Sequence, residues 1–367
     1  MGAVYAATPG SGETKMKRLA WMIVGLATFA LAWAQAQAQA PTPAKPADAK
    51  VGAELKIAYP DWLFPVDDET LRAAKRPPSK QPKEPPKYDD VELLTIPDSD
   101  QKFTLARIND PFNAPDWFPA AHGPMPDIVA KGHKPKIIAC AYCHTPTGQG
   151  RPENAALAGL PEAYIKEQLE AFRSGARRSI GPEVYVPSHM MQPLAATLTD
   201  QEIDESARYY AQQKLARRHY VVEGINIPRA EPAFWVYKEV DGTEDLGERL
   251  VEVAPDIARH ERRDPKMQYT VYAPPGSLVR GKSLATTGDK GKTQICSTCH
   301  LARLEGTDKI PPIAGRSPTY LLRQLIAFRN GARSNEAAKQ MDAVVEKLEL
   351  EDMVALAAYV GSLYPPK

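Results

Sequence analysis

Four cysteines occur in the 367-residue sequence, and all of them stand in two copies of one short motif. The motif is Cys-x-x-Cys-His, formed by Cys140, Cys143 and His144 in the first copy and by Cys296, Cys299 and His300 in the second. This spacing is the attachment signature of c-type haem. Each thiol adds to one haem vinyl group to form a thioether, and the adjacent histidine ligates the iron as the proximal base. The sequence therefore predicts two haem c groups, each bonded covalently to the chain.

Three other uses of paired cysteines fit the spacing less well. A zinc ribbon needs two Cys-x-x-Cys pairs about 15–20 residues apart, whereas about 150 residues separate these two pairs. A thioredoxin-like dithiol requires a βαβ context, which neither flank offers. Two structural disulfides are compatible with an oxidising compartment, but a two-residue loop is a cramped closure. The repeated histidine favours haem attachment over all three.

The surroundings of the two motifs repeat at the same offset of 156 residues, which indicates a duplicated domain. The matching pairs include Ala158-Gly159 with Ala314-Gly315, Tyr164 with Tyr320, Gln168-Leu169 with Gln324-Leu325, Ala171-Phe172-Arg173 with Ala327-Phe328-Arg329, and Gly175-Ala176-Arg177 with Gly331-Ala332-Arg333. Apolar periodicity predicts one helix over 161–175 and its counterpart over 317–331, each ended by glycine. A last helix is expected from 199 or 200 to about 213, and from 349 to about 363.

The loop before each last helix supplies a candidate for the sixth iron ligand. The last helices align at an offset of 150 residues, and in that register Met191 and Met341 coincide. Methionine opposite histidine closes the iron coordination and raises its reduction potential. Met190 and His189 are alternative ligands in the first copy, and His189 would give a bis-histidine haem. Met353 aligns with an isoleucine and is interpreted as a core residue.

These motifs together resemble the class I cytochromes c, and specifically the tandem two-haem kind known as cytochrome c-four. The resemblance covers about 104–218 and 276–367 and implies an all-α fold, in which the first and last helices of each domain cross beside the haem. It also implies that a backbone carbonyl accepts the proximal imidazole N–H. Pro311 occupies the family's place for this carbonyl, while the first copy has Ala155 there.

The rest of the chain departs from that family. The expected organisation is a signal peptide over 1–38, a Pro-rich extended segment over 39–103, cytochrome domain 1 over 104–218, an irregular or small-β interdomain linker over 219–275, and cytochrome domain 2 over 276–367. The signal rests on basic residues, an apolar run of about 15 residues and Ala-x-Ala sites. Translation starts at Met1 or at Met16. The Pro-rich segment is interpreted as a strap docked by aromatics or as a partner-binding arm, with a mobile basic stretch over Lys75–Lys87.

These observations predict a periplasmic electron carrier that is not itself an enzyme. Its expected partners are redox proteins: a quinol–cytochrome c reductase, a dehydrogenase or a terminal oxidase. A net charge of +1 gives no reason to expect nucleic acid, and membrane association is expected only through partners or an uncleaved signal. An alternative is the electron-accepting cytochrome subunit of a periplasmic dehydrogenase complex. A dihaem peroxidase is disfavoured, because it needs one iron with a displaceable ligand and both copies hold a methionine.

Overall fold

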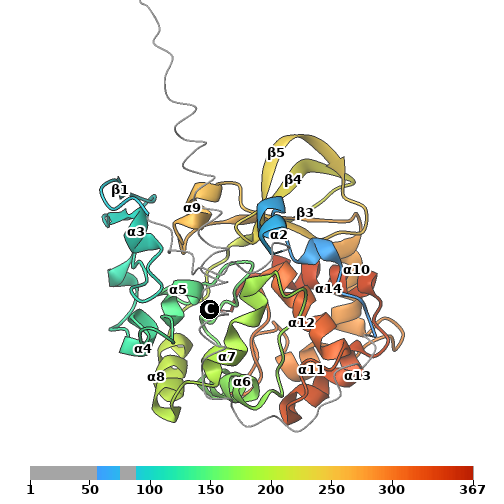
Figure 1. Ribbon diagram of the computed structural model, residues 1–367. Coiled ribbons are helices and arrows are strands. Elements are labelled where there is room, and N and C mark those ends of the chain that lie inside the picture. Colours follow the sequence, from blue (N-terminus) through green and yellow to red (C-terminus); the bar gives the residue numbers. More distant parts are fainter. Residues whose placement is uncertain (1–55, 75–87, 367) are drawn as a thin grey trace, which may run out of the picture.

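The computed structural model describes residues 56–74 and 88–366 (Figure 1). The expected signal peptide over 1–38 and the basic stretch Lys75–Lys87 lie outside the described residues. Among the residues that are described, none forms a helix with the length and apolar character needed to cross a membrane. The described chain folds into two groups of helices with a β-sheet beside them (Figure 1).

The helices of the first copy begin and end close to where local signals predict. The copy contains α3 (Leu105–Ile108), α4 (Asp127–Ala130), α5 (Cys140–His144), α6 (Glu162–Ser174), α7 (Met191–Ala195) and α8 (Asp200–Ala211), with 3₁₀ turns η2 (Pro119–Ala121) and η3 (Val186–His189). Helix α6 follows Pro161 and ends at Gly175, which adopts a left-handed φ of 78°. Helix α8 starts with a capping box between Thr199 and Glu202.

The second copy repeats this arrangement and adds a full-length first helix. Its elements are α10 (Ser277–Thr287), α11 (Ser297–His300), α12 (Pro318–Arg329), η4 (Glu336–Met341), α13 (Asp342–Val345) and α14 (Leu350–Ser362). Pro318 occupies the first turn of α12 after an N-cap at Ser317. Helices α10 and α14 approach closely at Gly281, so the expected crossing of first and last helices is present here. In the first copy the corresponding α4 is a single turn.

The prediction of an all-α fold is wrong, because residues 219–273 form a five-stranded mixed sheet. The strands are β3 (His219–Glu223), β4 (Asn226–Ala233), β5 (Val236–Asp245), β6 (Val251–Val253) and β7 (Tyr269–Ala273), with α9 (Ile257–Glu261) before the last of them. Their spatial order is β3-β7-β6-β5-β4. The β3–β7 and β5–β6 pairs are parallel, and the other two pairs are antiparallel.

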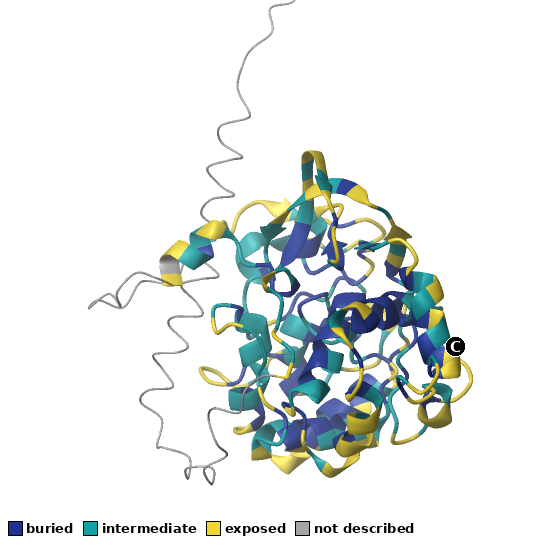
Figure 2. Ribbon diagram, turned by 90° about the vertical axis from the view of Figure 1, so that its right-hand side faces the viewer, coloured by how far each residue is buried: buried dark blue, intermediate teal, exposed yellow. Residues whose placement is uncertain are grey.

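Side-chain alternation explains why this segment forms a sheet instead of an irregular linker. In β7 the residues Tyr269, Val271 and Ala273 are buried, while the two between them are partly exposed. Val271 and Ala273 belong to the same apolar cluster as side chains of α12 and α14. The sheet therefore packs against the second copy and is a structural layer in its own right (Figures 1 and 2).

The segment before the first copy is docked through aromatic side chains, as one of its two interpretations predicts. It contains η1 (Asp61–Leu63), α2 (Asp68–Ala74), β1 (Leu93–Leu94) and β2 (Phe103–Thr104). Phe64 is 3% exposed and lies in the apolar core of the second copy. The backbone of Ile57 exchanges two hydrogen bonds with the Asn330 side chain, at 3.0 and 2.8 Å. Farther along, the buried Trp117 indole donates to the Arg262 carbonyl at 2.7 Å.

Candidate haem sites

Both motif histidines are held in the orientation that iron ligation requires. His144 and His300 are buried, and each places Nδ1 within hydrogen-bonding distance of a backbone carbonyl. The acceptor is Ala155 at 2.8 Å in the first copy and Pro311 at 2.9 Å in the second, so the expected carbonyl partners are confirmed. Because a carbonyl only accepts, Nδ1 carries the proton and Nε2 is left to bind metal. Burial lowers the pKa of both imidazoles, which favours the neutral form that ligates.

The two motifs face one continuous cavity of about 640 Å³. All four cysteines and both histidines line it, and none of the four cysteines forms a disulfide. Burial raises the pKa of the Cys140 thiol to about 12 and that of the Cys296 thiol to about 11. The walls are mainly apolar side chains such as Leu169, Phe172 and Leu325. The cavity thus combines thiols, imidazoles and an apolar lining, which is the donor set and environment of covalently bound haem.

The methionines expected as sixth ligands reach the same cavity. Met191 begins α7 and Met341 ends η4, and both side chains line the cavity together with Met190. His189 is not among the lining residues, and its Nε2 lies 3.2 Å from the Pro182 carbonyl. The geometry therefore disfavours the bis-histidine alternative and leaves the choice between Met190 and Met191 open. Met353 is fully buried in the core away from the cavity, as expected.

Two buried arginines join the copies beside the shared cavity. The backbones of Arg177 and Arg333 pair as an antiparallel bridge, and the guanidinium of each reaches across to the other copy. Arg177 donates to Tyr320 and Gln324 at 3.1 and 2.9 Å, and Arg333 donates to Tyr164 and Gln168 at 3.1 and 2.8 Å. Among the described residues neither arginine has a carboxylate within ion-pair distance, and Arg333 Nε has no hydrogen-bond acceptor. Buried cations without a counter-ion fit a cofactor that carries carboxylates, as haem does.

Comparisons with known proteins agree with this geometry. The family model described as cytochrome c matches residues 129–214. A cytochrome c-554(548) from Halomonas halodenitrificans is 32% identical over 80 residues, which are 22% of this chain and 89% of that protein. This chain belongs to the cytochrome c family.

Longer relatives match this cytochrome over more residues than one copy contains. A thiosulfate dehydrogenase electron acceptor from Stutzerimonas stutzeri is 26% identical over 235 residues, covering 63% of this chain and 82% of the relative. A cytochrome c4 from the same species is 26% identical over 243 residues, covering 64% of this chain and 89% of the relative. The chain is therefore a tandem class I cytochrome c that carries two covalently bound haem c groups and transfers electrons.

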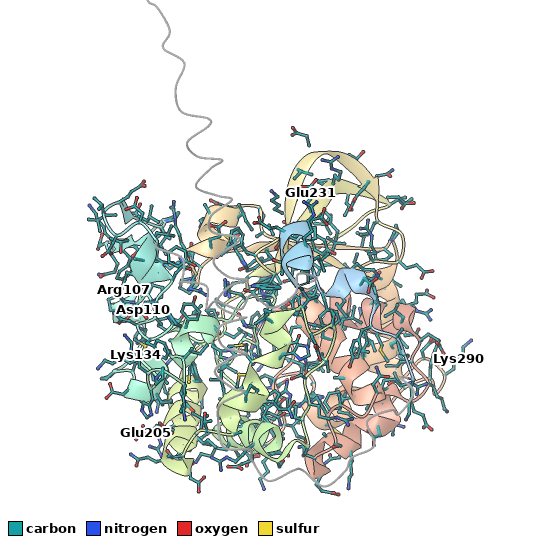
Figure 3. All side chains as sticks on the ribbon, in the orientation of Figure 1. Arg107, Asp110, Lys134, Glu205, Glu231 and Lys290 are labelled. Carbon is teal, nitrogen blue, oxygen red and sulfur yellow. The ribbon has the colours of Figure 1, made fainter. Side chains whose placement is uncertain are left out.

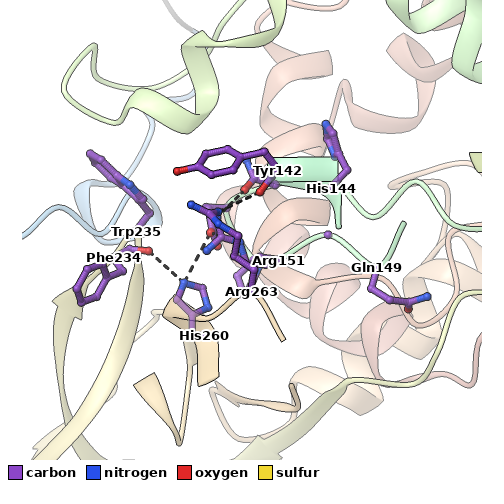
Figure 4. Close-up of polar contacts among 12 residues, drawn as sticks. Tyr142, His144, Gln149, Arg151, Phe234, Trp235, His260 and Arg263 are labelled. Atoms are coloured by element: carbon purple, nitrogen blue, oxygen red, sulfur yellow. Dashed lines mark hydrogen bonds and ion pairs between the residues drawn. The ribbon is translucent and has the colours of Figure 1, made fainter. Parts of the chain in front are cut away.

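A cluster of buried charged groups lies beside the first motif, and the sequence did not predict it. Figure 4 shows His260 near Arg151 and Arg263, with Tyr142 of the motif beside them. Arg151 Nε lies 3.0 Å from a carboxylate oxygen of the fully buried Glu153, and His260 Nε2 lies 3.6 Å from the same oxygen. No local pattern marks these residues, because the sheet brings His260 and Arg263 to the motif from more than 100 residues away. Glu153 also lines the cavity, so the cluster borders the first haem site.

Proposed function

We propose that this cytochrome holds its haems through the residues that line the shared cavity. Cys140 and Cys143 would form the thioethers of the first haem, and Cys296 and Cys299 those of the second. The iron of the first haem would be held by His144 and Met191, and that of the second by His300 and Met341. The observation that carries this assignment is the convergence of all eight residues on one cavity, four from each repeat. The buried arginines at the junction of the copies, Arg177 and Arg333, would bind haem carboxylates, and their lack of a carboxylate partner in the described part of the chain supports this.

The role that follows is one-electron transfer without catalysis at the iron. When bound, each haem supplies an iron that alternates between ferrous and ferric states. The protein contributes Nε2 of a neutral imidazole, a methionine sulfur and an apolar wall that excludes water. Methionine ligation on both irons would leave neither iron with an open position for a substrate. This supports a carrier and argues against a peroxidase.

The proposed electron donor is a dehydrogenase, and the proposed location is the periplasm. One relative is named as the electron acceptor of thiosulfate dehydrogenase, and a second, from Chlorobaculum tepidum, as the cytochrome subunit of sulfide dehydrogenase. The n-region, apolar run and Ala-x-Ala sites over 1–38 support export. A quinol–cytochrome c reductase is the other candidate donor, with a terminal oxidase as acceptor. The two cytochrome domains are proposed to span 104–218 and 276–367.

A second candidate is a permanent subunit of a dehydrogenase complex. The specific observation in its favour is the edge strand β3, which exposes Val222 at 47%, followed by Ile225 at 65%. Open strand edges with apolar side chains are recurrent association sites. If the second candidate holds, the cytochrome should co-purify with a larger subunit from its native host. A free carrier should instead be isolated alone.

One optical experiment tests the ligand assignment. Mature protein from a host able to attach haem should contain two haems per chain, which resist extraction into acidified organic solvent because they are bonded through sulfur. Its ferric spectrum should be low-spin and should show the near-infrared charge-transfer band of methionine–iron ligation. A colourless product, extractable haem or a high-spin ferric spectrum would refute the assignment.

A further inference from the structure

The two haem-attachment motifs are equivalent in sequence but differ in exposure. At the offset of 156 residues, partly buried Cys143 corresponds to exposed Cys299. Directly after the motif histidine, the buried Thr145 corresponds to Leu301, which is 42% exposed. The difference continues along the loop, where the buried members of the pairs are Pro146, Pro152 and Glu153, and their exposed counterparts are Ala302, Asp308 and Lys309. One attachment face is therefore covered and the other is open.

The cover over the first motif is made by this chain and is firmly fixed. The Arg263 guanidinium stacks on the Tyr142 ring at 3.6 Å and donates to the Tyr142 carbonyl at 3.0 Å. Its Nε donates at 3.2 Å to the carbonyl of Ile108, at the end of α3 in the first copy. From the start of the sheet, Arg218 donates to the carbonyls of Gln149 and Gly150, both at 2.9 Å. Arg218 and Arg263 thus hold the segment that forms the sheet over this motif.

No equivalent of this cover lies over the second motif in the described part of the chain. Around Cys299 the exposed side chains are mostly uncharged and include Ile295 at 39% and Leu301 at 42%. Thr298 and Ala302, on either side of the motif's end, are exposed as well. The nearest charges largely balance one another, since Arg303 contacts Glu305 at 3.6 Å and Asp308 is adjacent to Lys309. The open face is therefore neutral and partly apolar.

The rate of electron transfer between proteins falls steeply with distance. A haem covered by a folded layer therefore exchanges electrons slowly with an external partner. We propose that the face around Cys299 is the only surface through which this cytochrome exchanges electrons with partners; we call it the port. The haem of the first copy then exchanges electrons only through that of the second. This inference rests on the proposed attachment sites. The partner it fits is a redox protein that docks through an uncharged face, because the rim offers no excess charge to steer a charged one.

Site-directed labelling tests the port directly. With four cysteines bonded to haem, a cysteine introduced by Ala302→Cys is the only free thiol, and a 5 kDa polyethylene glycol maleimide can be attached to it. The matched control is Lys136→Cys, at the last exposed position before the first motif. Stopped-flow oxidation of the fully reduced holoprotein by azurin, a blue-copper carrier, is followed for both haems. The label at 302 should lower the oxidation rate of both haems at least tenfold. The label at 136 should lower neither rate by more than twofold.

Two outcomes would contradict the proposed port. Either the label at 302 lowers the oxidation rate of only one haem or of none, or the label at 136 lowers the rates equally. Failure of the proposed function is distinguishable, because unlabelled protein would then lack two covalent haems or would fail to exchange electrons at all. The neutral character of the face is tested with Leu301→Lys. This variant should slow the reaction severalfold at low salt, whereas the wild-type rate should change by less than twofold between 10 and 200 mM salt. A steep salt dependence of the wild-type rate would contradict an uncharged docking face.

Discussion

The proposed ligation of iron by a methionine sulfur can be tested at two adjacent methionines of the first copy. Met190 and Met191 both line the cavity, but only Met191 shares its place in the repeat with Met341. We predict that Met191→Leu removes the charge-transfer band of one haem and lowers that haem's reduction potential, because methionine ligation stabilises ferrous iron. Near-infrared absorbance and a redox titration measure the two effects.

The control for this prediction is Met190→Leu, which changes the neighbouring lining residue without altering its apolar character. It should leave the band intensity and both midpoint potentials as in the wild type. If Met190→Leu instead halves the band while Met191→Leu preserves it, the ligand assignment in the first copy moves by one residue and the repeat register is wrong there.

Glu261 makes the pH dependence of stability testable at a site away from the irons. Burial raises the pKa of its carboxyl to about 8, against the lowering effect of Arg262 and Lys238, and one of its oxygens has no hydrogen-bond donor. The folded protein therefore keeps this proton after the unfolded chain has lost it near pH 4.5. The contribution of Glu261 to the free energy of unfolding therefore falls as pH rises from about 4.5 to 8.

We accordingly predict that Glu261→Gln is more stable than the wild type at pH 8, by on the order of 1–3 kcal/mol, and that the difference disappears near pH 4.5. Chemical unfolding of the holoprotein at both pH values measures it. Glu248→Gln, at an exposed position in the turn before β6, serves as the control and should show no such trend. A constant difference between the two pH values would mean that Glu261 is ionised in the folded state.

At the scale of elements, the crossing of α10 and α14 depends on a missing side chain. A Cβ atom at Gly281 would clash with the Ala355 carbonyl oxygen and would lie 2.6 Å from the Tyr359 Cβ, so the helices would have to separate. We predict that Gly281→Ala destabilises the protein by about 1–3 kcal/mol, even though alanine favours helix, because overpacking outweighs propensity. Gly123→Ala meets no atom within 4 Å and should be nearly neutral in the same thermal unfolding experiment.

Elements governed by local chemistry were predictable, and those governed by distant pairing were not. Helix α12 was anticipated from its apolar repeat, since a helix is specified within its own turns. The sheet depends on β3 and β7, whose parallel pairing of His219 with Tyr269 spans 50 residues. Strand β4 contains Pro228 and Pro232, which argue against a strand unless it lies at an edge, as it does. Edge position is a property of the assembled sheet and leaves no local mark.

The same distinction applies to the candidate site. The cysteines and histidines are recognisable because haem attachment demands a fixed spacing, which the repeat presents twice. The methionines were predicted from a shared position before each last helix, because their distance from the motif differs by six residues between the copies. The cluster of Arg151, Glu153 and His260 has no spacing rule of its own, because it is assembled by the sheet docking on the first copy. The sequence therefore proposes the residues whose spacing the cofactor dictates, but it did not indicate the charged cluster that the sheet assembles beside them.

At the scale of the whole molecule, the two copies share one electrostatic environment. Arg177 and Arg333 cross between them, so each guanidinium is hydrogen-bonded to glutamine side chains of both copies. A buried positive charge disfavours the ferric state of any iron near it, and it acts over several ångströms because burial weakens screening. Each arginine should therefore affect the potential of both haems instead of only that of its own copy.

We predict that Arg333→Gln lowers both midpoint potentials, by on the order of 50 mV, in a redox titration of the holoprotein. Arg333→Lys keeps the charge and should recover most of the shift, which separates electrostatics from a change in packing. Lys166→Gln removes a positive charge from the surface of α6, two residues from Gln168 and outside the cavity, and should shift neither potential appreciably, because solvent screens it. A shift confined to one haem would show that the copies are electrostatically separate and that the arginine crossing is purely structural.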